Sequence, residues 1–386
     1  MNRLARSALF ALPLLFAFAC GEDDNGGTPA GSAGSSAGGA SSGGGSGGSG
    51  ATGGSGDTQG FGPVWIIKRD LQKVAVLDGE GNELFTDSVS SEPLGLALEG
   101  NNAWVILEGG QILRYDVGAR VRKATITGAR KPQRLAAAGN AAWVVDDTGV
   151  ACGGTPEEGP RRLHRVDGAT DKIVSTTNLN LDETGSSCDP TDALAADAQG
   201  AYALINNGFG VMRITNDGKV AGRAKLGLEG GYGTGNGALT STTLWVVDRP
   251  KNRLLDLDPA TLAQRATIAL PDDVTGAVMT ASDKAVWLGS PAGILRIDAT
   301  ATSTTKTITL EALPDAFARS TRGLYVAGGG GEGAIVILDA VTGEKKGQIP
   351  QAYADGLAVP LSPLDRQASE RRPNEAKAPM PKVRSG

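Results

Sequence analysis

Short apolar runs of strand length recur along the chain and alternate with turn-forming residues. The unit is clearest over residues 244–270, where Leu-Trp-Val-Val and Leu-Leu-Asp-Leu-Asp are separated by a turn and a third run ends at Leu270. Apolar runs of this length, bounded by Pro, Gly, Asn and Asp, are typical of antiparallel strands joined in series. The pattern therefore predicts an all-β meander.

One aromatic residue leads the same run in each unit. These lead aromatics are Trp65, Trp104, Trp143, Tyr202, Trp245, Trp287 and Tyr325, and the differences between successive numbers are 39, 39, 59, 43, 42 and 38. A period near 40 residues with four short strands per unit is typical of a β-propeller. Since aromatic residues make up only 4% of the chain, we interpret these positions first as structural markers of the repeat.

The strand count predicts how the propeller closes. If each unit contains strands A to D with the lead aromatic on B, the A strands fall at 94–98, 134–138, 193–196, 238–240, 277–280, 316–318 and 356–359. The B strand of Trp65 then has no A strand before it, and the A strand 356–359 has no B strand after it. Pairing the two removes two exposed sheet edges. We therefore predict seven four-stranded antiparallel blades over residues 61–361, closed by the C-terminal strand.

Residues 1–20 form a predicted targeting segment. Arg3 and Arg6 precede an apolar run at 8–19 that is too short to span a bilayer comfortably, and Cys20 follows at once. This segment resembles a bacterial lipoprotein signal, in which the cysteine is lipidated and becomes the mature N-terminus. Residues 17–19, Ala-Phe-Ala, also fit an ordinary A-x-A cleavage site. By the lipoprotein resemblance, Gly21 in place of Asp implies export to the outer membrane.

The flanks of the predicted propeller lack a core. Residues 21–60 are mostly Gly, Ser, Ala and Thr, a composition that favours a disordered tether with a root-mean-square span of roughly 30 Å. Residues 362–386 contain six Lys and Arg against three Asp and Glu, without apolar periodicity, and we expect a disordered tail. The net charge is −5 and the repeats contain no basic block, which argues against nucleic acid as a partner. We expect a monomer.

The chain has three cysteines. Removing the lipidated Cys20 leaves Cys152 and Cys188, in a protein predicted to be exported to a compartment where disulfides persist. Cys152 falls in a predicted B–C loop and Cys188 in the following D–A loop. Because strands alternate in direction, both loops emerge on the same face of the propeller. We therefore predict a Cys152–Cys188 disulfide.

That face also carries the longest predicted loops, at 148–162, 182–189, 229–237 and 328–333. Loop enlargement on one face of a repeat protein often marks its working face, although neutral drift in tolerant loops is an alternative. The residues that enter strand A there would line the mouth of a central channel: Leu94, Gln133, Asp192, Gly237, Gly276, Asp315 and Asp355.

Three carboxylates in that ring, Asp192, Asp315 and Asp355, could bind a divalent cation or a basic group. Tyr232 and Arg249 are predicted on neighbouring loops and could add stacking or an anion contact, and Gln133 completes the candidate binding residues. The alternative is that the three carboxylates are solvated turn residues. No cofactor is predicted beyond this candidate cation site.

Several predicted C strands end in Asp before a tight turn: Asp78, Asp116, Asp167, Asp258, Asp298 and Asp339. A carboxylate at this point can accept hydrogen bonds from the turn amides. The combination of apolar-Trp-Val with Leu-x-x-Asp-x-x-Thr-Gly resembles the YVTN and NHL class of propellers, including streptogramin-lyase-like members, over residues 61–360. The resemblance implies the fold and little about activity.

The same resemblance limits the candidate chemistry. Quinoprotein propellers place a Trp soon after this turn, where this chain has Ile or Val, so we expect no quinone cofactor. Streptogramin lyases rely on a catalytic histidine and a metal-bound carboxylate. The single histidine, His164, lies on a predicted C strand and does not align with a catalytic position, so we expect a partly exposed strand residue. We recognise no constellation of nucleophile and base.

The sequence thus predicts a lipid-anchored extracytoplasmic β-propeller that binds an unknown protein, glycan or small ligand, on the periplasmic side or at the cell surface. A metal-dependent lyase or lactonase-type enzyme is the second hypothesis. A structural protein of the cell envelope is the third.

Overall fold

The computed structural model describes, within the unit Gly54–Gly386, the residues 61–146, 161–179, 191–205, 210–226, 234–248, 251–271, 274, 278–290, 293–299, 306–310, 314–320, 322–328, 333–350 and 352–360. All regular elements in these ranges are β-strands. None of the described residues forms a helix long and apolar enough to cross a membrane. The predicted signal segment, tether and C-terminal tail lie outside the described residues.

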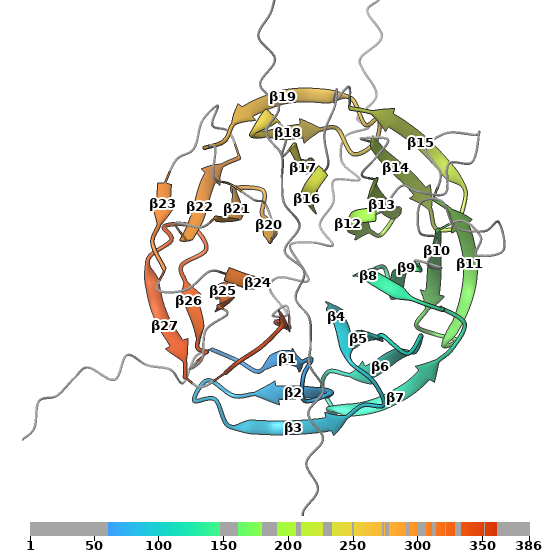
Figure 1. Ribbon diagram of the computed structural model, residues 1–386, viewed down its shortest axis with the longest axis vertical. Coiled ribbons are helices and arrows are strands. Elements are labelled where there is room, and N and C mark those ends of the chain that lie inside the picture. Colours follow the sequence, from blue (N-terminus) through green and yellow to red (C-terminus); the bar gives the residue numbers. More distant parts are fainter. Residues whose placement is uncertain are drawn as a thin grey trace, which may run out of the picture. The chain divides into compact units, whose positions relative to one another are not determined.

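Seven four-stranded antiparallel sheets surround a common axis, as Figure 1 shows. We number them as blades and name their strands A to D from the axis outward. In this order, blade one contains β28 (Gly356–Ala358), β1 (Val64–Lys68), β2 (Lys73–Leu77) and β3 (Glu83–Ser88). Blade two contains β4 (Pro93–Glu99), β5 (Asn102–Leu107), β6 (Ile112–Asp116) and β7 (Val121–Ile126). Blade three contains β8 (Pro132–Ala138), β9 (Ala141–Asp146), β10 (Arg162–Asp167) and β11 (Lys172–Asn178).

The other four blades repeat this order. Blade four contains β12 (Thr191–Asp197), β13 (Gly200–Ile205), β14 (Gly210–Thr215) and β15 (Val220–Lys225). Blade five contains β16 (Thr234–Leu239), β17 (Leu244–Asp248), β18 (Arg253–Leu257) and β19 (Gln264–Ala269). Blade six contains β20 (Met279–Ala281), β21 (Ala285–Ser290), β22 (Gly293–Asp298) and β23 (Lys306–Ile308). Blade seven contains β24 (Pro314–Ser320), β25 (Gly323–Gly328), β26 (Ile335–Leu338) and β27 (Lys345–Ile349).

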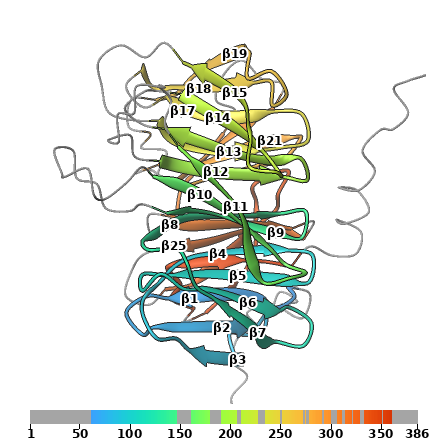
Figure 2. The ribbon, with the colours of Figure 1, turned by 90° about the vertical axis from the view of Figure 1, so that its right-hand side faces the viewer.

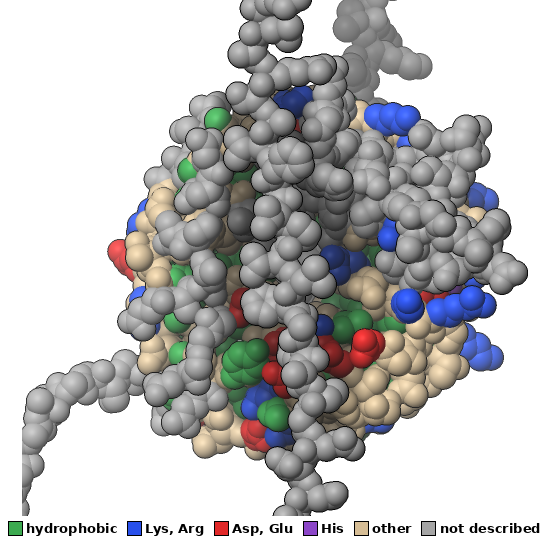
Figure 3. Space-filling view, in the orientation of Figure 1, with side chains coloured by type: hydrophobic (Ala, Val, Ile, Leu, Met, Phe, Trp, Pro, Cys, Tyr) green, Lys and Arg blue, Asp and Glu red, His purple; other side chains and the backbone are tan. Residues whose placement is uncertain are grey.

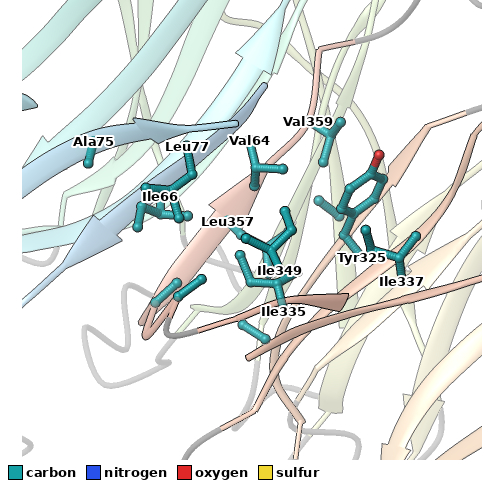
Figure 4. Packing of buried hydrophobic residues seen from close by; sticks show 14 residues of the cluster. Val64, Ile66, Ala75, Leu77, Tyr325, Ile335, Ile337, Ile349, Leu357 and Val359 are labelled. Carbon is teal, nitrogen blue, oxygen red and sulfur yellow. The ribbon is translucent and has the colours of Figure 1, made fainter. Parts of the chain in front are cut away.

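Blade one joins the two ends of the propeller. Strand β28 pairs with β1, with Trp65 opposite Ala358, and also lies against β4 and β24, the innermost strands of the two neighbouring blades. The layer between blades seven and one packs Val64 and Leu357 with Tyr325, which Figure 4 shows from close by. The predicted seven blades and their closure by the C-terminal strand are confirmed.

All seven lead aromatics lie on B strands and are at most 2% exposed. They fill the layers between blades, as expected for structural markers. On three of them an arginine from the adjacent C strand lies over the indole ring, 5.6–6.0 Å from its centre: Arg114 over Trp104, Arg165 over Trp143 and Arg296 over Trp287. At this distance a guanidinium is attracted by the ring face while its stem covers the indole.

The predicted role of the C-strand aspartates is confirmed at five of the six turns. The carboxylates accept hydrogen bonds from turn amides of Asn82, Ala119, Thr170, Thr261 and Thr342, at 2.7–3.0 Å. The residue four positions after the Asp has positive φ in several turns, including Leu262 at 60° and Gly343 at 74°. At the sixth turn, Asp298 forms an ion pair with Arg296 at 2.6 Å.

Strand alternation gives the propeller two different faces. The A–B and C–D turns, such as 100–101, 117–120, 139–140 and 168–171, form one face, which we call the turn face. The B–C and D–A loops, such as 69–72, 89–92, 108–111 and 127–131, form the other, which we call the loop face. Figure 2 shows the propeller edge-on. Because β1 begins and β28 ends at the turn face, the chain enters and leaves the propeller there.

Candidate functional site

The predicted binding residues coincide with a backbone irregularity that recurs in the innermost strands. The A–B pairing skips one residue between Pro93 and Gly95, Pro132 and Arg134, Thr191 and Ala193, and Pro314 and Ala316. The skipped residues are Leu94, Gln133, Asp192 and Asp315, the predicted positions in these blades. A β-bulge of this kind leaves one residue unpaired and re-aims its side chain. The bulges therefore set these residues apart from the regular A-strand pairing.

The equivalent positions complete a rim at the loop-face end of the A strands. In blade one the residue is Asp355, whose amide donates to the carbonyl of Ile67 at 3.0 Å. In blade five the pairing skips from Thr234 to Gly237, and Gly237 itself pairs with Val246. The predicted position Gly237 is therefore wrong. By this register Gly235 corresponds to Leu94 of blade two and occupies the rim instead. We call Leu94, Gln133, Asp192, Gly235, Asp315 and Asp355 the rim.

Several other predicted site residues are not placed by the structure. Gly276, Tyr232, Arg249, Cys20, Cys152 and Cys188 lie outside the described residues. For Asp192 the backbone is described within β12 but the side chain is not. The geometry of the site is therefore built from the remaining rim residues.

The carboxylate of Asp355 is held by two hydrogen bonds. One of its oxygens accepts the backbone amide of Arg69 at 2.7 Å, and the other accepts the hydroxyl of Tyr353 at 3.0 Å. The hydrogen bond to Asp355, and then the negative charge of that carboxylate, raise the pKa of Tyr353. The side chain of Arg69 is bound to Glu92 on the neighbouring D–A loop. Asp355 thus has fixed donors but no paired cation in any described contact.

Asp315 occupies the next blade of the ring, where β24 lies against β28. Desolvation at the rim, and then the negative charge of Asp355, raise the pKa of Asp315. Like charges held close disfavour joint ionisation, and a bound cation would relieve this repulsion. Two of the three predicted carboxylates therefore lie on neighbouring innermost strands.

Asp192 belongs to another part of the ring. It lies in blade four, which is three blades from blade seven with Asp315 and three blades from blade one with Asp355. In a seven-bladed ring this is the far side of the axis. The rim is therefore divided into an Asp315–Asp355 pair on one side and Asp192 on the other.

The surface near this pair is rich in charge. Figure 3 shows Asp and Glu side chains close to the ring axis, over β1 and β4. Among the described residues, no group of three or more His, Cys, Asp and Glu side chains is arranged to hold a metal ion. In the part of the chain that is described, the rim carboxylates form a pair.

A second polar group lies inside blade three and corrects an expectation from the sequence. His164 is 4% exposed, not partly exposed as predicted. Its Nε2 lies 3.2 Å from Oδ2 of Asp146, and its Nδ1 lies 2.9 Å from the hydroxyl of Thr176. Asp146 is 1% exposed. A buried carboxylate, an imidazole and a hydroxyl are therefore connected across three strands.

Asp146 also fixes the loop that leads to the rim. Its Oδ1 accepts the backbone amides of Arg130 and Lys131, at 3.0 and 2.7 Å. Burial alone would raise the pKa of Asp146, but the hydrogen bonds from His164 and from these two amides outweigh it and hold the pKa below its usual value. Asp146 is therefore an ionised acceptor at neutral pH.

The sequence contains a signal for this buried aspartate. Blades three and five both contain Trp-Val-Val-Asp, at 143–146 and 245–248. The second aspartate, Asp248, is also fully buried and is bound by Arg253 of the adjacent strand. A charged residue three positions after the lead aromatic therefore marks a buried ionic group at the loop-face end of the B strand.

No protein-family model matches the chain, and no curated protein is significantly similar to it. Solved structures do share its architecture. The chain is similar to apo AztD from Citrobacter koseri, with TM-score 0.57 and 14% identity over 77% of this chain and 96% of that one. This chain has the β-propeller fold.

Two further structures have the same arrangement. The computationally designed Ika8 protein gives TM-score 0.54 at 15% identity, over 76% of this propeller chain and 86% of its own. Dihydro-heme d1 dehydrogenase NirN, solved in complex with DHE, gives TM-score 0.55 at 14% identity over 76% of this chain. The match spans 64% of the dehydrogenase. At these identities the likeness shows the fold alone.

Proposed function

We propose that this protein is an extracytoplasmic binding module of the YVTN/NHL-like class, anchored to the outer membrane through a lipid on Cys20. Its ligand carries a cationic group and binds at the rim beside Asp315 and Asp355. The observation that carries this proposal is the pair of rim carboxylates on neighbouring innermost strands, where the charge of Asp355 raises the pKa of Asp315. A small ligand, glycan or protein with an exposed amine or a bound divalent cation would relieve that repulsion.

The position of the chain ends supports a binding role for the loop face. The first described residues, 61–63, lead into β1 at the turn face, and β28 ends at the same face. A tether attached there leaves the opposite face open to a partner. A lipid anchor, a Gly/Ser-rich tether and a binding face on the far side form one consistent design.

Site-specific photo-crosslinking tests this proposal in the intact envelope. A photoreactive residue is introduced at Gln133 on the rim, and a matched one at Ala119 in a C–D turn of the turn face. We expect a discrete cross-linked partner from position 133 and none from position 119. Cross-links to the same partner from both positions, or from position 119 alone, would contradict binding at the rim.

A metal-dependent lyase or lactonase-type enzyme is the second candidate, because the buried Asp146–His164 pair supplies a positioned imidazole. A structural envelope protein is the third. Turnover of a lactone by the full-length protein that requires a divalent cation and is lost with a chelator distinguishes the metal-dependent enzyme from both non-catalytic roles.

A further inference from the structure

The internal repeat identifies a position in blade three that departs from the other blades. One residue after each lead aromatic, the B strand pairs with a C-strand residue that is apolar in six blades: Ala75, Leu113, Met212, Leu255, Leu295 and Val336. In blade three the C-strand residue is His164, opposite Val144. A buried imidazole costs stability unless its nitrogens are hydrogen-bonded. A polar residue at an otherwise apolar repeat position therefore indicates a function.

On the D strand, the residue that pairs with this C-strand position is a threonine in five blades. These are Thr86, Thr125, Thr176, Thr267 and Thr307, each opposite the C-strand residue of its own blade. Thr176 is the member of this set that faces a histidine. Its side chain is exposed on the outer strand of the blade, as are those of Thr125 and Thr267. Thr125 and Thr267 therefore carry the same hydroxyl as Thr176, but without an imidazole opposite it.

The hydrogen bonds of His164 fix its tautomer when the ring is neutral. An ionised Asp146 only accepts hydrogen bonds, so Nε2 of His164 must carry a proton and donate to Oδ2. Nδ1 is then the acceptor, and it faces the hydroxyl of Thr176 at 2.9 Å. The two backbone amides on the other oxygen of Asp146 hold the carboxylate in place. A nucleophile, a base and a group that orients the base are therefore within hydrogen-bond reach.

We propose that Thr176 is a nucleophilic hydroxyl that accepts acyl groups from carboxylic esters, with His164 as its base and Asp146 as the residue that positions the base. The hydroxyl oxygen attacks the carbonyl carbon while its proton passes to Nδ1 of His164. The bond to the alcohol oxygen then breaks, and the imidazolium returns the proton to that oxygen. The products are an acyl ester on Thr176 and a free alcohol, and water releases the acid by the same route.

The site is separate from the rim. Thr176 lies on a D strand at the outer edge of the blade, and the rim residues lie on A strands at the axis. The acyl-transfer site therefore does not depend on ligand binding at the rim. Failure of one proposal leaves the other standing.

The test is acetylation of the full-length protein by p-nitrophenyl acetate. Peptide mapping by mass spectrometry measures the acetylation rate at Thr176 and, in the same sample, at Thr125 and Thr267. We expect Thr176 to react faster than both controls. His164→Leu installs the residue found in three other blades and should slow acetylation of Thr176 by about 10²-fold or more, the usual contribution of a positioned base.

Three further variants separate loss of the nucleophile from loss of folding. Thr176→Val, on an exposed strand, should abolish the burst of p-nitrophenolate, while the matched Thr125→Val should retain it. Thr176→Ser should also retain it. Acetylation of Thr176 at the rate of Thr125 and Thr267, or at an unchanged rate in a folded His164→Leu variant, would overturn the proposal.

Discussion

The guanidinium of Arg114 in blade two binds the carboxylate of Asp171 in blade three through two hydrogen bonds, Nε to Oδ1 at 2.6 Å and Nη2 to Oδ2 at 2.7 Å. The same guanidinium lies over Trp104 and donates to the side chain of Asn102 at 2.9 Å. Hydrogen bonds and the negative charge of Asp171 raise the pKa of Arg114. One side chain thus connects a lead aromatic to the turn of the next blade.

Substitution of Arg114 should therefore weaken the contact between blades. We expect Arg114→Ala to lower the free energy of unfolding by about 1–3 kcal/mol, the range for losing charged hydrogen bonds at a partly buried site. Denaturant unfolding measures this change. The matched control is Lys219→Ala, because the Lys219–Asp217 ion pair is fully exposed and should leave stability unchanged. Equal losses in both variants would contradict a role in blade cohesion.

Ring closure gives the second prediction. Deleting residues 354–360 removes β28 and leaves β1 with an unpaired edge and part of its packing layer exposed. We expect a sharp fall in melting temperature together with aggregation, measured by thermal melts and light scattering. Deleting residues 367–386 is the control and should change neither property. Similar behaviour of the two deletions would contradict closure by the C-terminal strand.

The proposed anchor gives the third. Cys20→Ala should remove the acceptor of the lipid, so that labelled palmitate is incorporated into the wild-type protein and not into the variant. The variant should also leave the membrane fraction. Absence of label from both proteins would instead indicate cleavage as a secreted protein.

The predicted Cys152–Cys188 disulfide gives the fourth. Mass spectrometry of the non-reduced protein should show one cross-linked peptide that contains both cysteines. The chain-entropy contribution for a loop of this length is roughly 3–4 kcal/mol. Reduction should therefore lower the melting temperature of the wild type and leave that of a Cys152→Ser/Cys188→Ser variant unchanged. Free thiols at both positions in freshly exported protein would refute the pairing.

The number of blades could be predicted because its signals are local. A lead aromatic, an apolar run and an Asp-capped turn recur within each repeat, and the unpaired first and last strands leave closure as the consistent solution. The residues 193–196 and 134–138, for example, fall inside the observed A strands β12 and β8. Local patterns of this kind do not require knowledge of tertiary contacts.

The site was harder to predict because it depends on register. In blade five, the bulge between Thr234 and Gly237 places the rim position at Gly235, two residues before the predicted Gly237. The alternation of apolar and polar residues along a strand does not show where a β-bulge inserts an extra residue. The Asp146–His164–Thr176 group was missed because its members lie on three strands, and their contact depends on the pairing of His164 with Thr176.

The pH dependence of the rim follows from the raised pKa of Asp315. A carboxyl whose pKa is higher in the folded state than in the unfolded state binds more protons when folded. The free energy of unfolding therefore falls as the pH rises from the unfolded-state pKa to the folded-state pKa. Above the folded-state pKa of Asp315, the ionised carboxylate destabilises the folded protein to the full extent. A bound cation should therefore stabilise the protein at neutral pH and lose its effect in acid.

Thermal melts with added cations test the central claim most directly. The wild type, an Asp315→Asn/Asp355→Asn variant and an Asp192→Asn control are heated at neutral pH with calcium, magnesium or a trilysine peptide. The account predicts that at least one of these cations raises the melting temperature of the wild type and of the Asp192→Asn control, and that the double variant shows no rise. No cation-dependent shift in the wild type, or the same shift in the double variant, would contradict binding at the Asp315–Asp355 pair.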